Sequence, residues 1–138
     1  MAGCMFYPVS AVVEWKDKTS NIIRTRDFSY VTDEPKDDMD NDLGPTPAEM
    51  LLWSAAGCVA ISIEQIAMHR GIPFSAVMTE ASAVFRGAQE GMQNLRFKVH
   101  VKSDAGKEVF EKIAEKVLRV SPILNSLKTS ATIEIVMQ

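Results

Sequence analysis

The sequence predicts an α+β fold, a mostly antiparallel sheet with a long central helix. An apolar run over residues 46–70 is bounded by helix start and stop signals. Residues 95–102 alternate between apolar and polar side chains, the pattern of a half-buried strand. The expected strands come in groups instead of alternating singly with helices, which favours α+β over a doubly wound sheet. Because 138 residues is the length of one domain, we expect residues 1–138 to form a single domain.

The composition is that of a soluble globular protein, with 46% hydrophobic and 24% charged residues and a net charge of -3. This mild acidity gives no electrostatic reason to expect DNA or RNA as a partner. No signal-peptide pattern opens the chain. The apolar run carries Glu49, Glu64 and His69, which a membrane-spanning helix disfavours. We therefore expect a cytoplasmic protein without membrane contact, whose two cysteines, Cys4 and Cys58, are reduced.

The first third of the chain predicts a β-hairpin and an acidic loop. Residues 9–15 alternate as a strand, residues 16–21 form a polar turn, and residues 22–31 form a second, more polar strand. Residues 33–42, with the sequence DEPKDDMDND, follow as a loop. Their spacing does not match an ordered cation site, so we expect a solvated connection.

The central helix has clear signals at both ends. Thr46 is the expected N-cap, Pro47 occupies the first helical position, and Glu49 completes a capping box. Gly71 follows the last turn. The run is apolar on most faces, which indicates a helix buried all round. About 24 residues would span roughly 36 Å. A chain this short cannot easily cover such a helix, so we expect either a kink or a second chain.

The remainder predicts two strands, two helices and a last strand. Residues 74–85 and 95–102 are the strands, separated by a loop over residues 86–93. His100 falls on the outer face of the second strand, where we expect an ordinary surface histidine. Residues 107–119 form an amphipathic helix, a short helix restarts with Ser121 as N-cap before Pro122, and residues 132–136 form the final strand.

Cys58 is the residue whose chemistry the sequence raises first. A cysteine inside an apolar helix is often a small hydrophobe in a core. Here it shares a stripe within about 40° with other polar residues, Ser54, Ser62, Gln65 and His69. The stripe suggests a cleft or a seam between helices, although Ser54 and Ser62 could also bond helix carbonyls. A reactive Cys58 would need a thiolate-stabilising partner; the candidates are Lys16, Lys18, Arg24 and Arg26.

Three segments resemble the OsmC/Ohr family, the osmotically inducible protein C and organic hydroperoxide resistance proteins. They are the helix start GPTPAE at residues 44–49, AAGC at residues 55–58 and SPIL at residues 121–124. The resemblance runs from about Val9 to the C-terminus. It implies an OsmC-like fold and an intertwined homodimer with active sites at the subunit interface. It also implies a first cysteine that attacks a peroxide and a second that resolves the sulfenic acid as a disulfide, which a thiol then reduces.

The chain departs from that pattern at three positions. Cys58 matches the first cysteine, but Ser121 occupies the position of the resolving cysteine and cannot form a disulfide. The family's glutamate after the helix-start proline is replaced by Ala48, with Glu49 one residue later. Glu49 lies nine residues, or about 180°, from Cys58 on an ideal helix. The hairpin turn offers Lys16 and Lys18 in place of the arginine that the resemblance implies.

Two functions remain open at this stage. The first is thiol-dependent reduction of organic hydroperoxides, a one-cysteine peroxidase of the oxidative stress response with Cys58 as the peroxidatic residue. Glu49 and Lys16 are its secondary candidates, an external thiol its reductant, and Cys4 a resolving thiol only if the N-terminus folds over the site. The second is a non-catalytic binding or sensor protein that holds a small apolar or thiol ligand, for example coenzyme A, at the dimer-interface cleft.

No cofactor or metal is expected for either function. Two isolated cysteines and two histidines have no pair with metal-ligand spacing.

Overall fold

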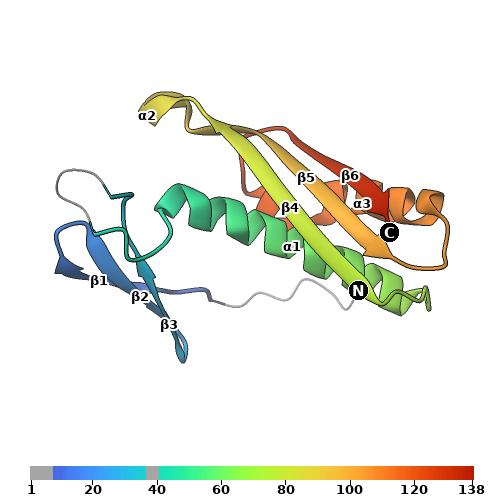
Figure 1. Ribbon diagram of the computed structural model, residues 1–138, viewed down its shortest axis with the longest axis horizontal. Helices are drawn as coiled ribbons and strands as arrows, with labels where there is room; N and C mark the ends of the chain where they lie inside the picture. The colour runs from blue at the N-terminus through green and yellow to red at the C-terminus, as the bar shows by residue number, and fades with distance from the viewer. Residues whose placement is uncertain (1–7, 37–40) are drawn as a thin grey trace. The chain divides into compact units, whose positions relative to one another are not determined.

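The structure, a computed structural model, describes residues 8–36 and 41–138. The chain divides into two compact units, residues 1–50 and residues 51–138 (Figure 1). The elements, in chain order, are β1 (Val12–Asp17), β2 (Ser20–Thr25), β3 (Phe28–Thr32), α1 (Pro47–His69), β4 (Ala76–Phe85), α2 (Gly87–Glu90), β5 (Met92–Lys102), α3 (Lys107–Val120), α4 (Pro122–Asn125) and β6 (Ala131–Met137). The fold is α+β with a long helix, as predicted, and its strands form two three-stranded sheets.

The N-terminal unit is an antiparallel sheet in the order β1-β2-β3. The prediction of one strand over residues 22–31 was wrong, because the chain reverses between β2 and β3. Arg26 adopts the left-handed region at φ 51°, which closes a tight turn with Asp27. The first strand also begins at Val12 and not at Val9.

Asp33 is buried, so the prediction of a solvated connection was wrong at its first residue. Its Oδ1 accepts from Thr19 Oγ1 at 2.6 Å and from the Glu34 backbone N–H at 2.9 Å. Its Oδ2 accepts from Ser20 Oγ at 2.6 Å and from the Leu43 N–H at 3.1 Å. These bonds, that of Ser20 foremost, hold the pKa of the Asp33 carboxyl far below its usual range. Residues 37–40 of the acidic stretch lie outside the described residues.

The segment before α1 is held against β3. The Asp33 N–H donates to the Pro45 carbonyl at 3.2 Å, and Thr32 Oγ1 donates to the same oxygen at 2.8 Å. A Cβ atom at Gly44 would lie 2.2 Å from the Val31 carbonyl oxygen, so only glycine allows this approach. The chain is thereby fixed where the helix begins.

α1 is a single helix that begins and ends as predicted. Among its residues only Ala55, Val59, Ile63 and Ala67 are fully buried, one turn apart along one face. Three large apolar side chains remain 50%, 54% and 61% exposed: Trp53, Ile61 and Met68. The prediction of a helix buried all round was therefore wrong for the chain taken alone. One face of α1 packs in the core and another is apolar and uncovered.

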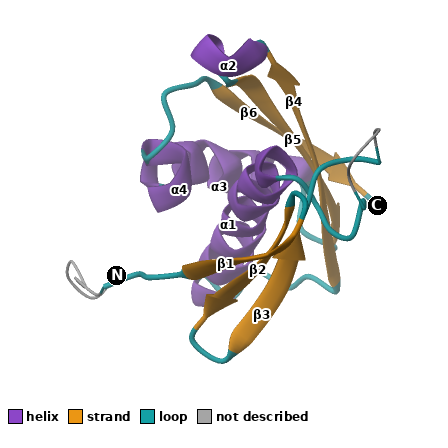
Figure 2. Ribbon diagram, turned by 90° about the vertical axis from the view of Figure 1, so that its left-hand side faces the viewer, coloured by secondary structure: helices purple, strands orange, loops and turns teal. Residues whose placement is uncertain are grey.

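The C-terminal unit is a second sheet in the order β4-β5-β6. β4 and β5 are antiparallel, whereas β5 and β6 are parallel and are joined through α3 and α4. Leu95, Phe97, Val99 and Val101 alternate along β5 and are buried. They form the core with α1 and α3, which both lie on this face of the sheet (Figures 1 and 2). Residues 87–90 of the predicted loop form the short helix α2.

His100 lies on the outer face of β5, as predicted, but it is more constrained than an ordinary surface histidine. Its side chain is 15% exposed, and Nε2 lies 2.7 Å from Glu80 Oε2 on the neighbouring strand. Nδ1 lies 2.9 Å from the Gln138 amide nitrogen, which can only donate. The hydrogen bond from His100, and secondarily the charges of His100 and Lys98, lower the pKa of Glu80. The histidine therefore links β4 to the residue after β6.

Candidate functional site

The Cys58 sulfur lies 3.1 Å from the Ser121 hydroxyl oxygen, although the two residues are 63 positions apart in the sequence. Cys58 is in the middle of α1 and is partly exposed. Its thiol is free. The structure therefore joins the two positions that the sequence singled out as the first cysteine and the replaced resolving cysteine.

Ser121 sits at the junction of α3 and α4 and is fully buried. Its backbone N–H donates to the Val117 carbonyl at 2.9 Å and so ends α3. Its hydroxyl oxygen accepts from the Leu124 N–H at 3.3 Å, and Pro122 follows at the first helical position. The predicted N-cap role is confirmed. Two helix ends thus fix the hydroxyl that faces Cys58.

The polar stripe on α1 is partly buried around Cys58 and exposed toward both ends of the helix. Cys58 and Ser62 are partly buried, whereas Ser54, Gln65 and His69 are exposed. Cys58 makes its side-chain hydrogen bond to another element, the α3–α4 junction. The seam hypothesis therefore fits the middle of the stripe.

Glu49 is engaged at the start of α1 and is not brought to Cys58. Its Oε2 accepts from the Thr46 N–H at 2.7 Å, while its own N–H donates to Thr46 Oγ1 at 3.1 Å. These two bonds are the predicted capping box. Glu49 also lies nine residues from Cys58 along one continuous helix, on the opposite side.

The candidate cations all lie in the N-terminal unit. Lys16 is exposed on β1. The others have partners within that unit: Lys18 Nζ with Asn41 Oδ1 at 3.2 Å, Arg24 with Glu14, and Arg26 over the Phe28 ring at 4.9 Å. Within the described part of the C-terminal unit, the hydrogen-bond partner of the Cys58 thiol is Ser121. Cys4 lies outside the described residues.

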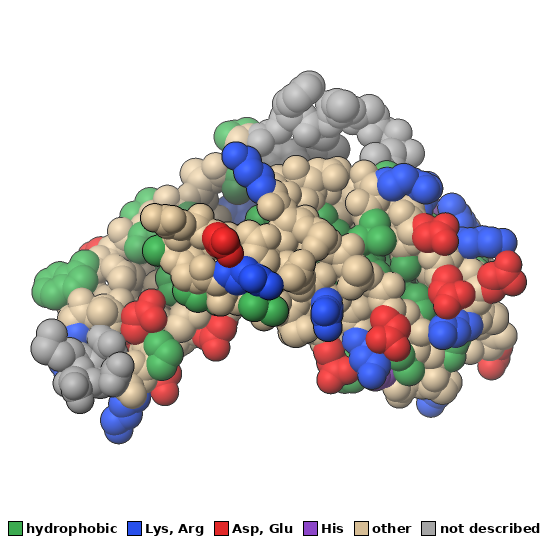
Figure 3. All heavy atoms as spheres, turned by 90° about the horizontal axis from the view of Figure 1, so that it is seen from above, with side chains coloured by type: hydrophobic (Ala, Val, Ile, Leu, Met, Phe, Trp, Pro, Cys, Tyr) green, Lys and Arg blue, Asp and Glu red, His purple; other side chains and the backbone are tan. Residues whose placement is uncertain are grey.

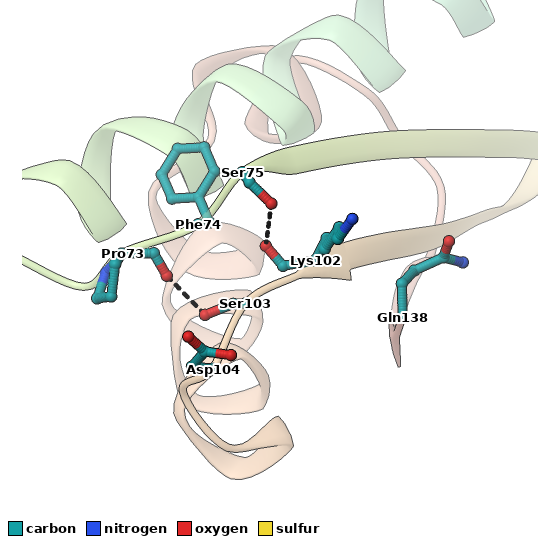
Figure 4. Close-up of a pocket in the computed structure, with 7 residues that line it drawn as sticks. All are labelled: Pro73, Phe74, Ser75, Lys102, Ser103, Asp104 and Gln138. Carbon is teal, nitrogen blue, oxygen red and sulfur yellow. Dashed lines mark hydrogen bonds between the residues drawn. The ribbon is translucent and has the colours of Figure 1, made fainter.

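Two surface pockets differ in their relation to Cys58. One of about 400 Å³ lies at the far end of the sheet, near Phe74, Lys102 and Gln138, and does not include the cysteine (Figure 4). A smaller one of about 170 Å³ has a mixed lining: four side chains are apolar (Leu51, Met92, Leu95 and Leu127) and four are polar (Glu90, Gln93, Lys128 and Thr129). Leu51 lies two turns before Cys58 and within about 20° of it around α1. Sequence reasoning missed this pocket, although the seven-residue spacing of Leu51 and Cys58 was a usable signal.

The described residues hold no group of three or more His, Cys, Asp or Glu side chains able to bind a metal ion. On the face drawn in Figure 3, the coloured acidic and basic side chains are interspersed. Separately, α3 carries two ion pairs between residues four positions apart, Lys107–Glu111 and Glu108–Lys112. The face therefore has the mixed charge of an ordinary solvated surface.

Solved structures with the same α+β fold are similar over nearly the whole chain. An OsmC-like protein of unknown function from Vibrio cholerae has a TM-score of 0.84 at 16% identity, covering 95% of this chain and 100% of that one. An OsmC-like protein from Mycoplasma pneumoniae has a TM-score of 0.83 at 14% identity, with 96% and 99% covered. An organic hydroperoxide resistance protein OsmC from Legionella pneumophila has a TM-score of 0.68 at 16% identity, with 98% and 99% covered.

The sequence model of the OsmC-like protein family matches residues 39–136. The chain therefore belongs to the OsmC-like protein family. No curated protein matches it significantly. The structural neighbours, all below 25% identity, show the shared fold. α1 is long and apolar enough to cross a membrane, but the core helix of a soluble protein has the same properties, and α1 supplies core residues here.

Proposed function

We propose that this protein reduces organic hydroperoxides through Cys58 alone, with an external thiol as reductant. The observation that carries the proposal is the free, partly exposed Cys58 thiol held 3.1 Å from Ser121. Family membership supports it, as does the name of the Legionella pneumophila neighbour, an organic hydroperoxide resistance protein. Ser121 has no sulfur, so the oxidised Cys58 must be resolved by a thiol from outside this pair.

The proposed reaction has three balanced steps. The Cys58 thiolate attacks the terminal peroxide oxygen, an S–O bond forms, the O–O bond breaks, and the alkoxide leaves as an alcohol after taking a proton. Cys58 becomes a sulfenic acid while the hydroperoxide is reduced. The thiolate of a small or protein thiol then attacks the sulfur and releases water, which gives a mixed disulfide. A second thiol breaks that disulfide and restores Cys58.

The pocket beside Leu51 offers some apolar side chains to an organic substrate. Leu51, Leu95 and Leu127 can contact a hydrocarbon group, and the polar side chains of Glu90, Gln93, Lys128 and Thr129 line the rest of the pocket. Leu51 in the pocket wall lies two turns before Cys58 and within about 20° of it around α1, although Cys58 itself does not line the pocket.

A homodimer belongs to the same proposal. Ile61 and Met68 leave part of one face of α1 apolar and exposed, and exposed apolar surfaces of this kind mark interaction sites. A second copy of the chain would bury this face. Light scattering should give the mass of two chains, and a monomer would contradict this part of the proposal.

The second candidate is a binding protein without turnover. The pocket beside Leu51 could hold a small ligand against its apolar side chains, and Cys58 could form a mixed disulfide with a thiol ligand such as coenzyme A. A partly buried thiol whose partner is a neutral hydroxyl is compatible with this function as well.

The test uses the full chain with Cys4→Ser, so that Cys58 is the single thiol. Intact mass is measured before and after one equivalent of cumene hydroperoxide, with dimedone present as a trap for sulfenic acid. We expect a dimedone adduct on Cys58, consumption of the peroxide, and repeated turnover when a dithiol is supplied. Cys58→Ser should show none of these.

The outcome separates the two candidates. Adduct formation no faster than on an unfolded cysteine peptide would contradict the peroxidase. An adduct already present on the purified protein would favour the binding protein, and its mass would give the ligand.

A further inference from the structure

We infer that the Ser121 hydroxyl donates a hydrogen bond to the Cys58 sulfur and so stabilises the thiolate, which makes Ser121 the positioning residue of the site. The inference rests on the proposed use of Cys58 as a nucleophile. It assigns to Ser121 the task for which the sequence suggested Lys16 or an arginine. The role of Ser121 follows from where its hydroxyl proton points, and all the residues involved lie in the C-terminal unit.

The direction of the bond follows from the other partner of Ser121. A serine hydroxyl has one proton to donate and two lone pairs to accept with. One lone pair already accepts from the Leu124 N–H at 3.3 Å. The hydroxyl proton therefore still needs an acceptor, and the Cys58 sulfur at 3.1 Å is its partner among the described residues.

Burial makes the opposite direction unfavourable. Ser121 is fully buried, so water does not reach its proton. If Cys58 donated instead, the serine would accept twice and its own O–H would have no partner. An unsatisfied buried donor costs more than a typical hydrogen bond contributes. The arrangement with Ser121 as donor satisfies all the groups involved.

A donor aimed at sulfur favours the charged form. Neutral sulfur is a weak acceptor, whereas a thiolate accepts strongly, so the same O–H stabilises the thiolate more than the thiol. The backbone keeps the donor in place, because the Ser121 N–H is bonded to Val117 and its carbonyl accepts from the Asn125 N–H at 3.0 Å. The hydroxyl therefore does not need to reorganise when the proton leaves Cys58.

The same geometry sets how the oxidised sulfur is resolved. A hydroxyl cannot displace the sulfenic oxygen to form a disulfide, but it can remain hydrogen-bonded to a Cys58 that has gained an oxygen. The sulfenic acid then stays available to a thiol that approaches from the exposed side of Cys58. Ser121 would thus activate the Cys58 thiol without resolving the sulfenic acid that forms there.

The test measures the rate of Cys58 alkylation by iodoacetamide from pH 5 to 10, in the full chain with Cys4→Ser. Ser121→Ala should move the pH profile to higher pH and lower the rate at pH 7 about tenfold, since hydrogen bonds to charged groups are worth that much. Ser121→Thr keeps the hydroxyl and should retain most of the rate. Ser126→Ala, which removes the exposed hydroxyl bonded to the Pro122 carbonyl at 2.8 Å, is the matched control and should change nothing.

Loss of the helix cap could also destabilise Ser121→Ala, so each rate is divided by the folded fraction measured by circular dichroism. As a second measurement, the native Cys4→Ser chain is compared with the same chain in urea. We expect the native profile to lie at lower pH. An unchanged profile in Ser121→Ala, or a native profile at or above that of the unfolded chain, would overturn the inference. Alkylation needs no hydroperoxide, so an inactive protein with the expected profile would refute only the proposed function.

Discussion

The sulfur of Cys58 and the hydroxyl of Ser121 are in hydrogen-bond contact across the seam between α1 and the α3–α4 junction. The 3.1 Å between them exceeds the S–S length of a disulfide, about 2.05 Å, by only about one ångström. The site therefore has the separation of a two-cysteine pair but the chemistry of one cysteine. Replacing a single atom at residue 121 would change how the oxidised site is resolved.

Ser121→Cys should create a peroxide-dependent disulfide with Cys58. In a Cys4→Ser background, one equivalent of hydroperoxide should leave the intact protein lighter by two hydrogens, and a dithiol should reverse the change. The matched control is Ser126→Cys at the exposed residue that directly follows α4, which should form no such bond within the chain. Failure of Ser121→Cys to lose two hydrogens would mean that the two side chains cannot approach in solution.

Glu49→Ala should lower the free energy of unfolding by about 1 kcal/mol, because it removes half of the capping box with Thr46. Peroxide consumption per folded molecule should stay unchanged, because the carboxylate is engaged at the start of α1. Urea unfolding and a peroxide assay provide the two measurements. Thr46→Ala should cost a similar amount, and the double variant less than the sum of the two. A loss of consumption without a loss of stability would instead give Glu49 a catalytic role.

Asp33→Asn should destabilise the protein in a pH-dependent way. The folded pKa of Asp33 is depressed, so its carboxylate contributes stability above the unfolded value of about 3.9, and this contribution is lost as the pH falls below it. The difference in urea midpoint between the native chain and Asp33→Asn should be large at pH 7 and shrink toward pH 3. Asp27→Asn, an exposed carboxyl in the same unit, should show little difference at either pH. A difference in urea midpoint that stays constant with pH would contradict the depressed folded pKa of Asp33.

Thr79→Val should raise the free energy of unfolding by about 1 kcal/mol. The Thr79 hydroxyl on β4 is the one buried side-chain polar atom without a hydrogen bond in the described residues. Valine has nearly the same shape and removes the cost of that unsatisfied group. Thr132→Val on β6, where the side chain is exposed, is the control and should have little effect. A destabilised Thr79→Val would show that the hydroxyl finds a partner in solution.

The sequence was sufficient to predict the structural features whose signal lies within a few neighbouring residues. The capping box of Thr46 and Glu49, the end of α1 and the Ser121 cap all follow from residues within four positions of one another. These features were correctly predicted because a helix end selects its own residue types. The alternation of apolar and polar residues along β5 is also a local signal, and it identified the buried face of that strand.

The sequence was insufficient where partners are distant. Asp33 was taken for a loop residue because Thr19, Ser20 and Leu43 bond it from ten or more positions away. His100 was placed on the correct face, but its bonds to Glu80 and Gln138 depend on the pairing of strands. The burial of α1 was overestimated, because an apolar face shows only that a partner is needed and not that the same chain supplies it. Cys58 and Ser121 were associated by family resemblance, and spacing alone would not have done this.

The parallel pairing of β5 with β6 affects how the chain folds during its synthesis. β5 is the central strand, and β6 can join it only after α3 and α4 have been synthesised. During translation one edge of β5 therefore presents unpaired backbone groups next to its apolar residues, the arrangement that invites pairing with other chains. Ribosome-bound chains that are stalled before residue 131 should consequently depend strongly on chaperones for solubility. Chains tethered to the ribosome by a linker after β6, which lets β6 emerge, should depend on chaperones far less.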